Sequence, residues 1–97
     1  MTEEFIAIEI PVGEPQIEYS ERGDRWTPRG SVLRCVVEND AHGEACFLID
    51  DRELTCQQFG RLLRAYAGWG MRIVFVPAEA VHEQPLIEVR DPDVMAK

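Results

Sequence analysis

The chain has 97 residues, of which 45% are hydrophobic and 29% charged, and its formal net charge at pH 7 is −8. This length and composition predict one folded domain and argue against disorder throughout. The acidic balance argues against nucleic acid or an anionic membrane surface as a partner, because both require clustered positive charge. It leaves a protein partner, or good solubility alone, as explanations.

Two features of the sequence indicate the cellular compartment. The opening residues MTEEFIAIEIP lack the positive region and the continuous apolar run of a secretory signal. The three cysteines are an odd number, so they cannot all pair within one chain. We therefore expect a cytoplasmic protein with reduced thiols and no association with a membrane.

The first third of the chain predicts two strands separated by a long loop. In residues 5–10 (FIAIEI), the period of two of a strand places Ile6, Ile8 and Ile10 on one face, and Pro11 ends this pattern. Residues 12–30 are interrupted by glycine and proline and predict a long loop, with a short strand around residues 16–19 as an option. Residues 31–38 (SVLRCVVE) are rich in β-branched side chains, which favours a strand.

A hairpin and a helix follow. Residues 39–43 (NDAHG) predict a turn, and residues 44–50 (EACFLID) predict the returning strand. The hydrophobic period then becomes that of a helix, which we expect over about residues 56–67. Thr55 as the N-cap and Gln58 three residues later predict a capping box. The apolar face of this helix consists of Phe59, Leu62, Leu63 and Tyr66.

The end of the chain completes the predicted fold. Residues 71–76 (MRIVFV) predict a strand, and residues 86–90 (LIEVR) predict an edge strand. The expected architecture is an α+β domain of two layers, in which one amphipathic helix packs on a four- to five-stranded, mostly antiparallel sheet in the order β-loop-β-β-α-β. The domain is expected to span residues 1–90, followed by a flexible C-terminal tail over residues 91–97.

Trp69 stands between two glycines at the end of the predicted helix. Gly68 occupies the position where a helix end usually needs a left-handed backbone, and the residue after it often packs onto the last turn. Trp69 is therefore expected to pack on Tyr66 or Ala65. Two alternatives are an exposed aromatic patch for a protein partner, formed together with Trp26, and a stacking site for a small molecule.

Trp26 lies in the polar stretch RGDRWTPRG, where the demand for core residues is weak. Its side chain either folds back over the core or stays exposed. If the long loop and the sheet enclose a pocket, the sequence places Glu18, Tyr19, Asp24 and Trp26 around it, with Arg34 nearby.

The sequence contains five soft side chains that could bind a metal ion. The soft ligands are Cys35, Cys46, Cys56, His42 and His82, and no pair of them has the spacing C-x-x-C or H-x-x-x-H. We expect small buried thiols, with Cys35 and Cys46 as neighbours on paired strands, and no metal. A metal-dependent structural domain that uses the cysteines is the third alternative for the function.

The acids Asp50, Asp51 and Glu53 are better explained by a turn before the helix than by acid–base chemistry or a cation site. The sequence has neither the G-x-S-x-G motif of a serine hydrolase nor the G-x-x-x-x-G-K motif of a phosphate-binding loop. We therefore expect no catalytic residues and no cofactor.

The stretch from Leu54 to Val76 contains LTCQQFGRLLRAYAGWGMRIVF. It resembles a group of small bacterial domains without an assigned function, in which an F-G-x-x-L helix runs into G-W and a β-strand. The likeness covers about a quarter of the chain. Its motifs concern capping and packing, so the resemblance implies a fold rather than an activity, and no catalytic residue is carried over.

These observations together predict a non-enzymatic protein-interaction module, which binds another protein or associates with itself as a homodimer. Strands that are apolar on both faces, and two tryptophans in loops, support this interpretation. The side chains expected to bind are Trp26, Trp69, Tyr19 and Arg34. The alternative is a small ligand-binding domain or enzyme with a pocket between the 12–30 loop and the sheet.

Overall fold

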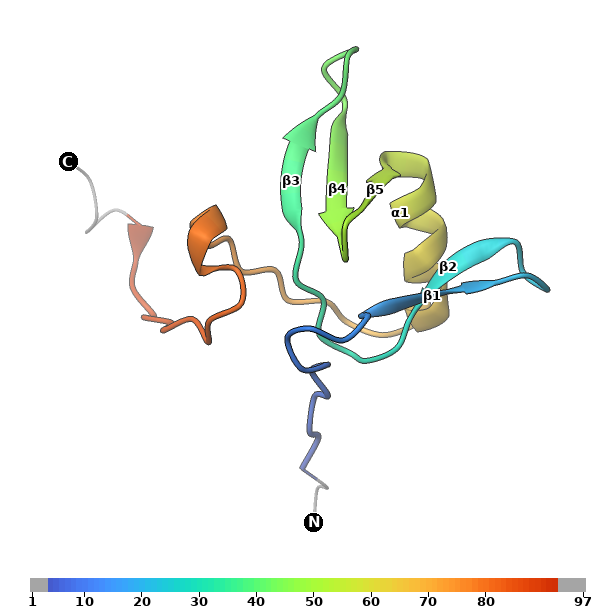
Figure 1. Ribbon diagram of the computed structural model, residues 1–97. Helices are drawn as coiled ribbons and strands as arrows, with labels where there is room; N and C mark the ends of the chain where they lie inside the picture. Colours follow the sequence, from blue (N-terminus) through green and yellow to red (C-terminus); the bar gives the residue numbers. More distant parts are fainter. Residues whose placement is uncertain (1–3, 93–97) are drawn as a thin grey trace.

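The computed structural model describes residues 4–92 (Figure 1). Five antiparallel strands form two sheets, β1-β2 and β3-β4-β5, and one helix packs against them. The α+β class expected from the sequence is confirmed, although two sheets replace the single one that was predicted. In chain order the elements are β1 (Ile17–Ser20), β2 (Arg25–Pro28), β3 (Val36–Asn39), β4 (Ala45–Ile49), β5 (Arg52–Thr55), α1 (Cys56–Leu63), and the 3-10 turns Arg64–Tyr66 and Ala78–Ala80.

The prediction of a long loop over residues 12–30 was wrong, because this stretch contains the β1–β2 hairpin. Only the short strand considered around residues 16–19 was close to the observed β1. The glycine and proline residues that suggested a loop lie at the turn and at the strand ends. Between them, aromatic and β-branched side chains such as Tyr19 and Trp26 lie opposite each other in the register and favour pairing.

The β3–β4 hairpin is confirmed, but β3 begins at Val36 and not at residue 31. The reason is tertiary. The main-chain N–H and C=O of Arg34 bond to the side chain of Gln16, so they are not available for a ladder with a neighbouring strand. Residues 31–35 were predicted as part of this strand, but they therefore do not extend it.

Strand β5 was missed by the sequence analysis. It follows β4 through a two-residue turn, because Ile49 lies opposite Arg52 in the register. Both turn residues, Asp50 and Asp51, have left-handed backbones with φ of 53° and 66°. A two-residue hairpin turn with two positive φ angles is of type I′, and aspartate is among the residues that tolerate this conformation.

The helix begins as predicted. Thr55 Oγ1 accepts a hydrogen bond from the Gln58 N–H at 3.1 Å, and Gln58 Oε1 accepts one from the Thr55 N–H at 2.9 Å. The capping box is therefore confirmed. The α-helix ends at Leu63, and the 3-10 turn Arg64–Tyr66 carries the chain close to the expected end.

The core lies where α1 covers both sheets. The ring of Phe59 on α1 stacks on Phe47 of β4, with 4.1 Å between the ring centroids. The helix also packs against β2, so it joins the two sheets. The buried cluster consists of Ile17, Ile49, Leu54 and Leu62, surrounded by Trp26, Leu33, Cys35, Phe59 and Leu63.

Three predicted strands, residues 5–10, 71–76 and 86–90, are not strands in the structure. Of these, only the first takes part in a bridge, a single parallel one between Glu9 and Val32. The alternation that predicted them is present, but no neighbouring strand of the described chain lies beside them. Figure 1 shows the orange part of the chain after residue 76 leading away from the sheets.

Two further points concern the extent of the chain. Part of the predicted flexible tail, residues 93–97, lies outside the described residues. None of the helices between residues 4 and 92 has the length and apolar character that a membrane crossing requires.

Candidate functional site

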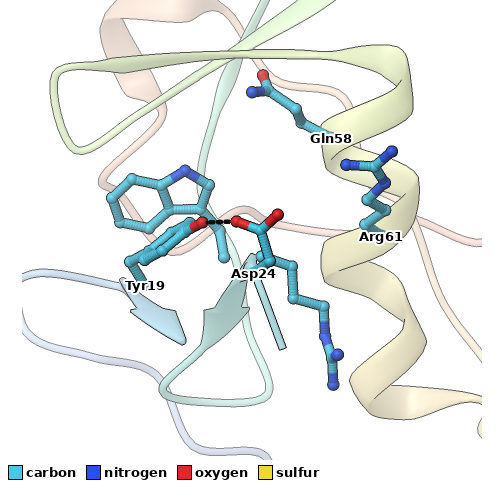
Figure 2. Close-up of a pocket in the computed structure, with 6 residues that line it drawn as sticks. Tyr19, Asp24, Gln58 and Arg61 are labelled. Carbon is cyan, nitrogen blue, oxygen red and sulfur yellow. Dashed lines mark hydrogen bonds between the residues drawn. The ribbon is translucent and has the colours of Figure 1, made fainter. Parts of the chain in front are cut away.

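A small pocket of about 130 Å³ lies between the β1–β2 hairpin and α1 (Figure 2). Figure 2 shows Tyr19 and Asp24 on the hairpin side and Gln58 and Arg61 on the helix. The lining side chains are Tyr19, Asp24, Arg25, Trp26, Gln58 and Arg61. Two of the side chains expected to bind a partner, Tyr19 and Trp26, therefore meet in one place. The hairpin pairing brings them together, because they are register partners.

The aromatic wall of this pocket is held in place from two sides. The rings of Tyr19 and Trp26 meet edge to face, with centroids 5.3 Å apart and an angle of 71° between the planes. The Arg52 guanidinium lies over the Trp26 ring, 4.6 Å from its centroid, in a cation–π contact. Trp26 is half-buried and packs on the core. Of the two positions considered for this indole, the structure has the one folded over the core.

The polar groups of the pocket comprise a tyrosine–aspartate pair, an amide and two guanidinium groups. The Tyr19 hydroxyl donates a hydrogen bond to the Asp24 carboxylate, and this bond raises the pKa of Tyr19 above its usual value. The phenol therefore holds its proton to a higher pH than an unpaired tyrosine does. Arg25 and Arg61 contribute two guanidinium groups, and the Nε of Arg25 is buried without a hydrogen-bond partner in the described structure.

Arg34 lies outside this pocket, and its side chain is committed to internal contacts. Only 7% of that side chain is exposed. Its Nη1 donates to Glu9 Oε2 at 2.7 Å and to the Ile10 carbonyl at 2.8 Å. Its Nε donates to His82 Nδ1 at 3.0 Å. The guanidinium thus joins segments from the beginning, the middle and the end of the described chain.

Gln16 and Asp50 extend the contacts of Arg34 into what we call the Arg34 network (Glu9, Gln16, Arg34, Asp50 and His82). Gln16 is 2% exposed and pairs with the main chain of Arg34. The Asp50 carboxylate accepts from the N–H groups of Gln16 and Ile17, at 2.5 Å and 3.1 Å. It also accepts from Gln16 Nε2 at 3.1 Å.

A groove of about 710 Å³ lies beside the Arg34 network. Residues 12–16 form one side of it, and Arg34, Leu48 and Val81 are among its other lining residues. The sequence had placed Arg34 beside the pocket of Tyr19, Asp24 and Trp26, with Glu18 in its wall. The structure divides that set: Arg34 lines the groove, and Glu18 lines neither cavity.

Trp69 packs as expected onto the end of the helix. Gly68 has a left-handed backbone with φ of 93°, and the Trp69 N–H donates to the Tyr66 carbonyl at 2.9 Å. The indole meets the ring of Tyr66 edge to face at 5.3 Å and that of Phe5 at 5.7 Å. The indole is nevertheless 59% exposed, and none of its ring contacts is shared with Trp26. The two tryptophans therefore do not form a joint patch.

Exposed apolar side chains are concentrated after α1. Met71 and Ile73 are each 63% exposed, and Phe75 is 84% exposed. Further along, Leu86 and Val89 are 99% and 98% exposed. On folded domains in general, large exposed apolar patches are found at sites of contact with other proteins.

The cysteines do not converge. Within residues 4–92, no three metal-ligating side chains come together. Cys35 is half-buried, Cys46 is buried, and Cys56 is exposed, contrary to the expectation that all three are buried. The expectation that Cys35 and Cys46 are neighbours on paired strands was also wrong. Cys46 lies opposite Glu38 in the register, and its thiol donates to Glu53 Oε2 at 3.0 Å.

Sequence analysis missed several polar residues of these sites. Gln58 was recognised only as a capping residue, and Arg61 was not assigned to any site. Their spacing of three residues places both on one side of α1, and this signal was available in the sequence. Gln16 and His82 carried no local signal, because their partners are 18 and 48 residues away.

Comparison with known proteins gives one match. The model of a family described as a domain of unknown function (DUF7713) matches residues 16–79, a range that runs from the start of β1 to the second 3-10 turn. Among curated proteins and among solved structures, no match to this chain was found.

Proposed function

The chain belongs to this DUF7713 domain family, and from that premise we propose that it is a non-enzymatic protein-interaction module that associates with itself as a homodimer. The observation that carries the proposal is that residues 71–76 are exposed and, in the part of the chain that the structure describes, unpaired. This segment has the side-chain pattern of a strand, is exposed, and has no strand beside it in the described chain.

The side chains of residues 71–76 support an interface. Met71, Ile73 and Phe75 alternate along the segment and are each more than 60% exposed. In an extended chain such residues lie on one face. A row of three large apolar side chains is costly to leave in water, at about 25 cal/mol for each Å² of apolar surface. Contact with a second protein surface would remove that cost.

The main chain of residues 71–76 supports the same conclusion. Within the described part of the protein, its N–H and C=O groups make no hydrogen bond to another main-chain group. An extended segment with unpaired main-chain groups is a template for pairing with another strand. Side chains and main chain therefore both favour addition of a strand from outside.

The protein exposes more surface than a compact monomer of its size, and this excess is large enough for a dimer interface. The accessible surface is 8206 Å². A folded monomer of this size exposes about 5,700 Å². The excess is greater than the roughly 800 Å² per partner that a standard interface buries. The radius of gyration of 15.5 Å likewise exceeds the value of about 12.5 Å that is typical of a compact chain of this length.

A ligand site in the hairpin–helix pocket is the second candidate function. The unpaired Nε of Arg25 beside an aromatic wall favours it. The volume of about 130 Å³ is less favourable, because sites for small molecules usually measure about 300–1,000 Å³. The cytoplasmic location, the bacterial origin and the lack of a nucleic-acid partner remain predictions from the sequence.

Light scattering over a dilution series tests the homodimer. We expect a dimer of the native chain, and monomers for the double variant Ile73→Ser/Phe75→Ser, which removes two exposed side chains and so leaves the core intact. Val12→Ser is the matched control, because Val12 is also exposed, at 62%, but lies outside the segment. A native chain that is monomeric at every concentration would overturn the proposal.

A further inference from the structure

We infer that the open edge of β3 receives residues 71–76 of a second copy of the chain as an added strand. This inference rests on the proposed self-association and identifies the surface on which it takes place. The sheet order, the direction of the main-chain groups of β3, and the charges on both segments support it.

Strand β3 is an edge strand. The three-stranded sheet has the order β3-β4-β5, so within residues 4–92 β3 has a neighbour on one side only. The opposite edge, β5, runs directly into α1, which packs against it (Figure 1). The outer edge of β3 is therefore the side of this sheet at which a further strand can pair.

The main-chain groups that face this open edge can be identified. The Asp40 N–H donates to the Glu44 carbonyl at 2.7 Å, so these two residues form a hydrogen-bonded pair. Hydrogen-bonded and non-hydrogen-bonded pairs alternate along an antiparallel ladder. It follows that Val37 and Asn39 are in non-hydrogen-bonded pairs with β4, and that their N–H and C=O groups point outward.

Three of the usual protections against strand addition (lysine, proline and a bulge) are absent from this edge, although β3 is short and carries the charged Glu38. Edge strands are commonly blocked by lysine, proline or a bulge, and residues 36–39 (VVEN) contain neither of those residues and pair with β4 in an uninterrupted register. Val37 is 51% exposed. The outer edge of β3 is thus short but open.

Charge favours residues 71–76 as the added strand. The acidic side chains at this edge and in its turn are Glu38, Asp40 and Glu44, whereas the only charged residue in 71–76 is Arg72. Two copies of 71–76 paired with each other would leave both arginines without an acidic partner from the opposite strand. The other exposed segments match this edge less well: residues 86–90 have an internal ion pair, between Arg90 and Glu88 at 3.5 Å, and so offer no net charge. Residues 5–8 are exposed but carry no charge.

A proline at the edge tests the inference. Val37→Pro removes an N–H that points outward, whereas the bonds from β3 to β4 use other residues. Val37→Thr is the matched control, because it keeps the N–H and a β-branched side chain. We expect the dissociation constant of the dimer, measured by light scattering, to rise about tenfold or more for Val37→Pro and to change little for Val37→Thr.

An exchange of charges provides a second measurement that does not depend on how the proline variant folds. Arg72→Glu is expected to weaken the dimer, because it places a carboxylate of the added strand against the acidic side chains at the β3 edge, and like charges opposite each other repel. Combining it with Glu38→Arg restores opposite signs and is expected to recover the affinity. A double variant that is as weak as Arg72→Glu alone would overturn the inference.

The outcomes separate the two proposals. If Ile73→Ser/Phe75→Ser abolishes the dimer but neither Val37→Pro nor the charge exchange alters its dissociation constant, the β3 edge is not the receiving surface and the homodimer stands. If the native chain is monomeric throughout, both proposals fail.

Discussion

Arg34 Nε donates a hydrogen bond to His82 Nδ1 at 3.0 Å, across 48 residues of sequence. It is the one hydrogen bond that joins residues 71–90 to residues 4–70. This bond connects the part of the chain that carries the exposed apolar side chains to the core, with the imidazole as the acceptor.

The first prediction follows from this bond. His82→Ala removes the acceptor and leaves a buried guanidinium N–H of Arg34 unpaired, which we expect to cost about 1–3 kcal/mol in the free energy of unfolding. Amide hydrogen exchange of residues 77–90 should become faster. His82→Gln, whose carbonyl oxygen can accept the same bond, should restore slow exchange. Equal exchange in all three proteins would contradict the role of this anchor.

The second prediction compares the two left-handed aspartates of the β4–β5 turn. Asp50→Gly is expected to lower the free energy of unfolding by about 1.5–3 kcal/mol, because its carboxylate accepts the three hydrogen bonds of Gln16 and Ile17. Asp51→Gly is expected to change it by less than about 0.5 kcal/mol, because relief of the left-handed backbone offsets the added freedom of the unfolded chain. Urea unfolding measures both, and similar losses would contradict the prediction.

The third prediction concerns thiol reactivity. The Glu53 carboxylate accepts a hydrogen bond from the Cys46 thiol and, together with burial, raises the pKa of Cys46 from 9.0 to about 11. The raised pKa contributes stability that is present below about pH 9 and is lost as the pH rises towards 11. Exposed Cys56 should therefore be alkylated before Cys46 near neutral pH.

Glu53→Gln tests the cause of that difference. The substitution removes the negative charge beside the thiol and should lower the pKa of Cys46, so that its alkylation accelerates in mildly alkaline solution. The rate at Cys56 serves as the internal control. Mass spectrometry of the alkylated protein follows both sites, and an unchanged rate at Cys46 would argue against the bond to Glu53.

The fourth prediction concerns the hairpin–helix pocket. The hydrogen bond to Asp24 is the main reason for the raised pKa of Tyr19. Asp24→Asn removes the charge and should lower that pKa, while asparagine tolerates the left-handed backbone with φ of 52° at this position. Ultraviolet absorbance of the phenolate during an alkaline titration reports the change, and Tyr66 gives a second phenol for comparison.

How far the candidate site could be predicted depends on which contacts are local. Tyr19 and Trp26 were expected to line one pocket, and the hairpin does place them opposite each other in its register, with their rings edge to face. Arg34 was expected beside them, but its partners Glu9, Gln16 and His82 lie 25, 18 and 48 residues away and draw it to another place. No spacing in the sequence encodes such contacts, because they form only after the separate segments have packed.

The sequence by itself determined the features that depend on neighbouring residues. These are the capping box of Thr55 and Gln58, the left-handed Gly68 with Trp69 packed behind it, and the β3–β4 hairpin. Each is held by hydrogen bonds or ring contacts within about one turn or one hairpin of sequence, so the local residues were sufficient to predict it.

Which β-patterned segments become strands depends on tertiary packing. Strands β1 and β2, within residues 17–28, pair with each other and pack against α1, whereas the more apolar residues 71–76 stay unpaired in the described chain. The physical reason is that a helix satisfies its main-chain groups internally, while a strand requires an edge supplied by another segment. A period of two in the sequence states that a segment can pair, but the partner is chosen by the packing of the whole molecule.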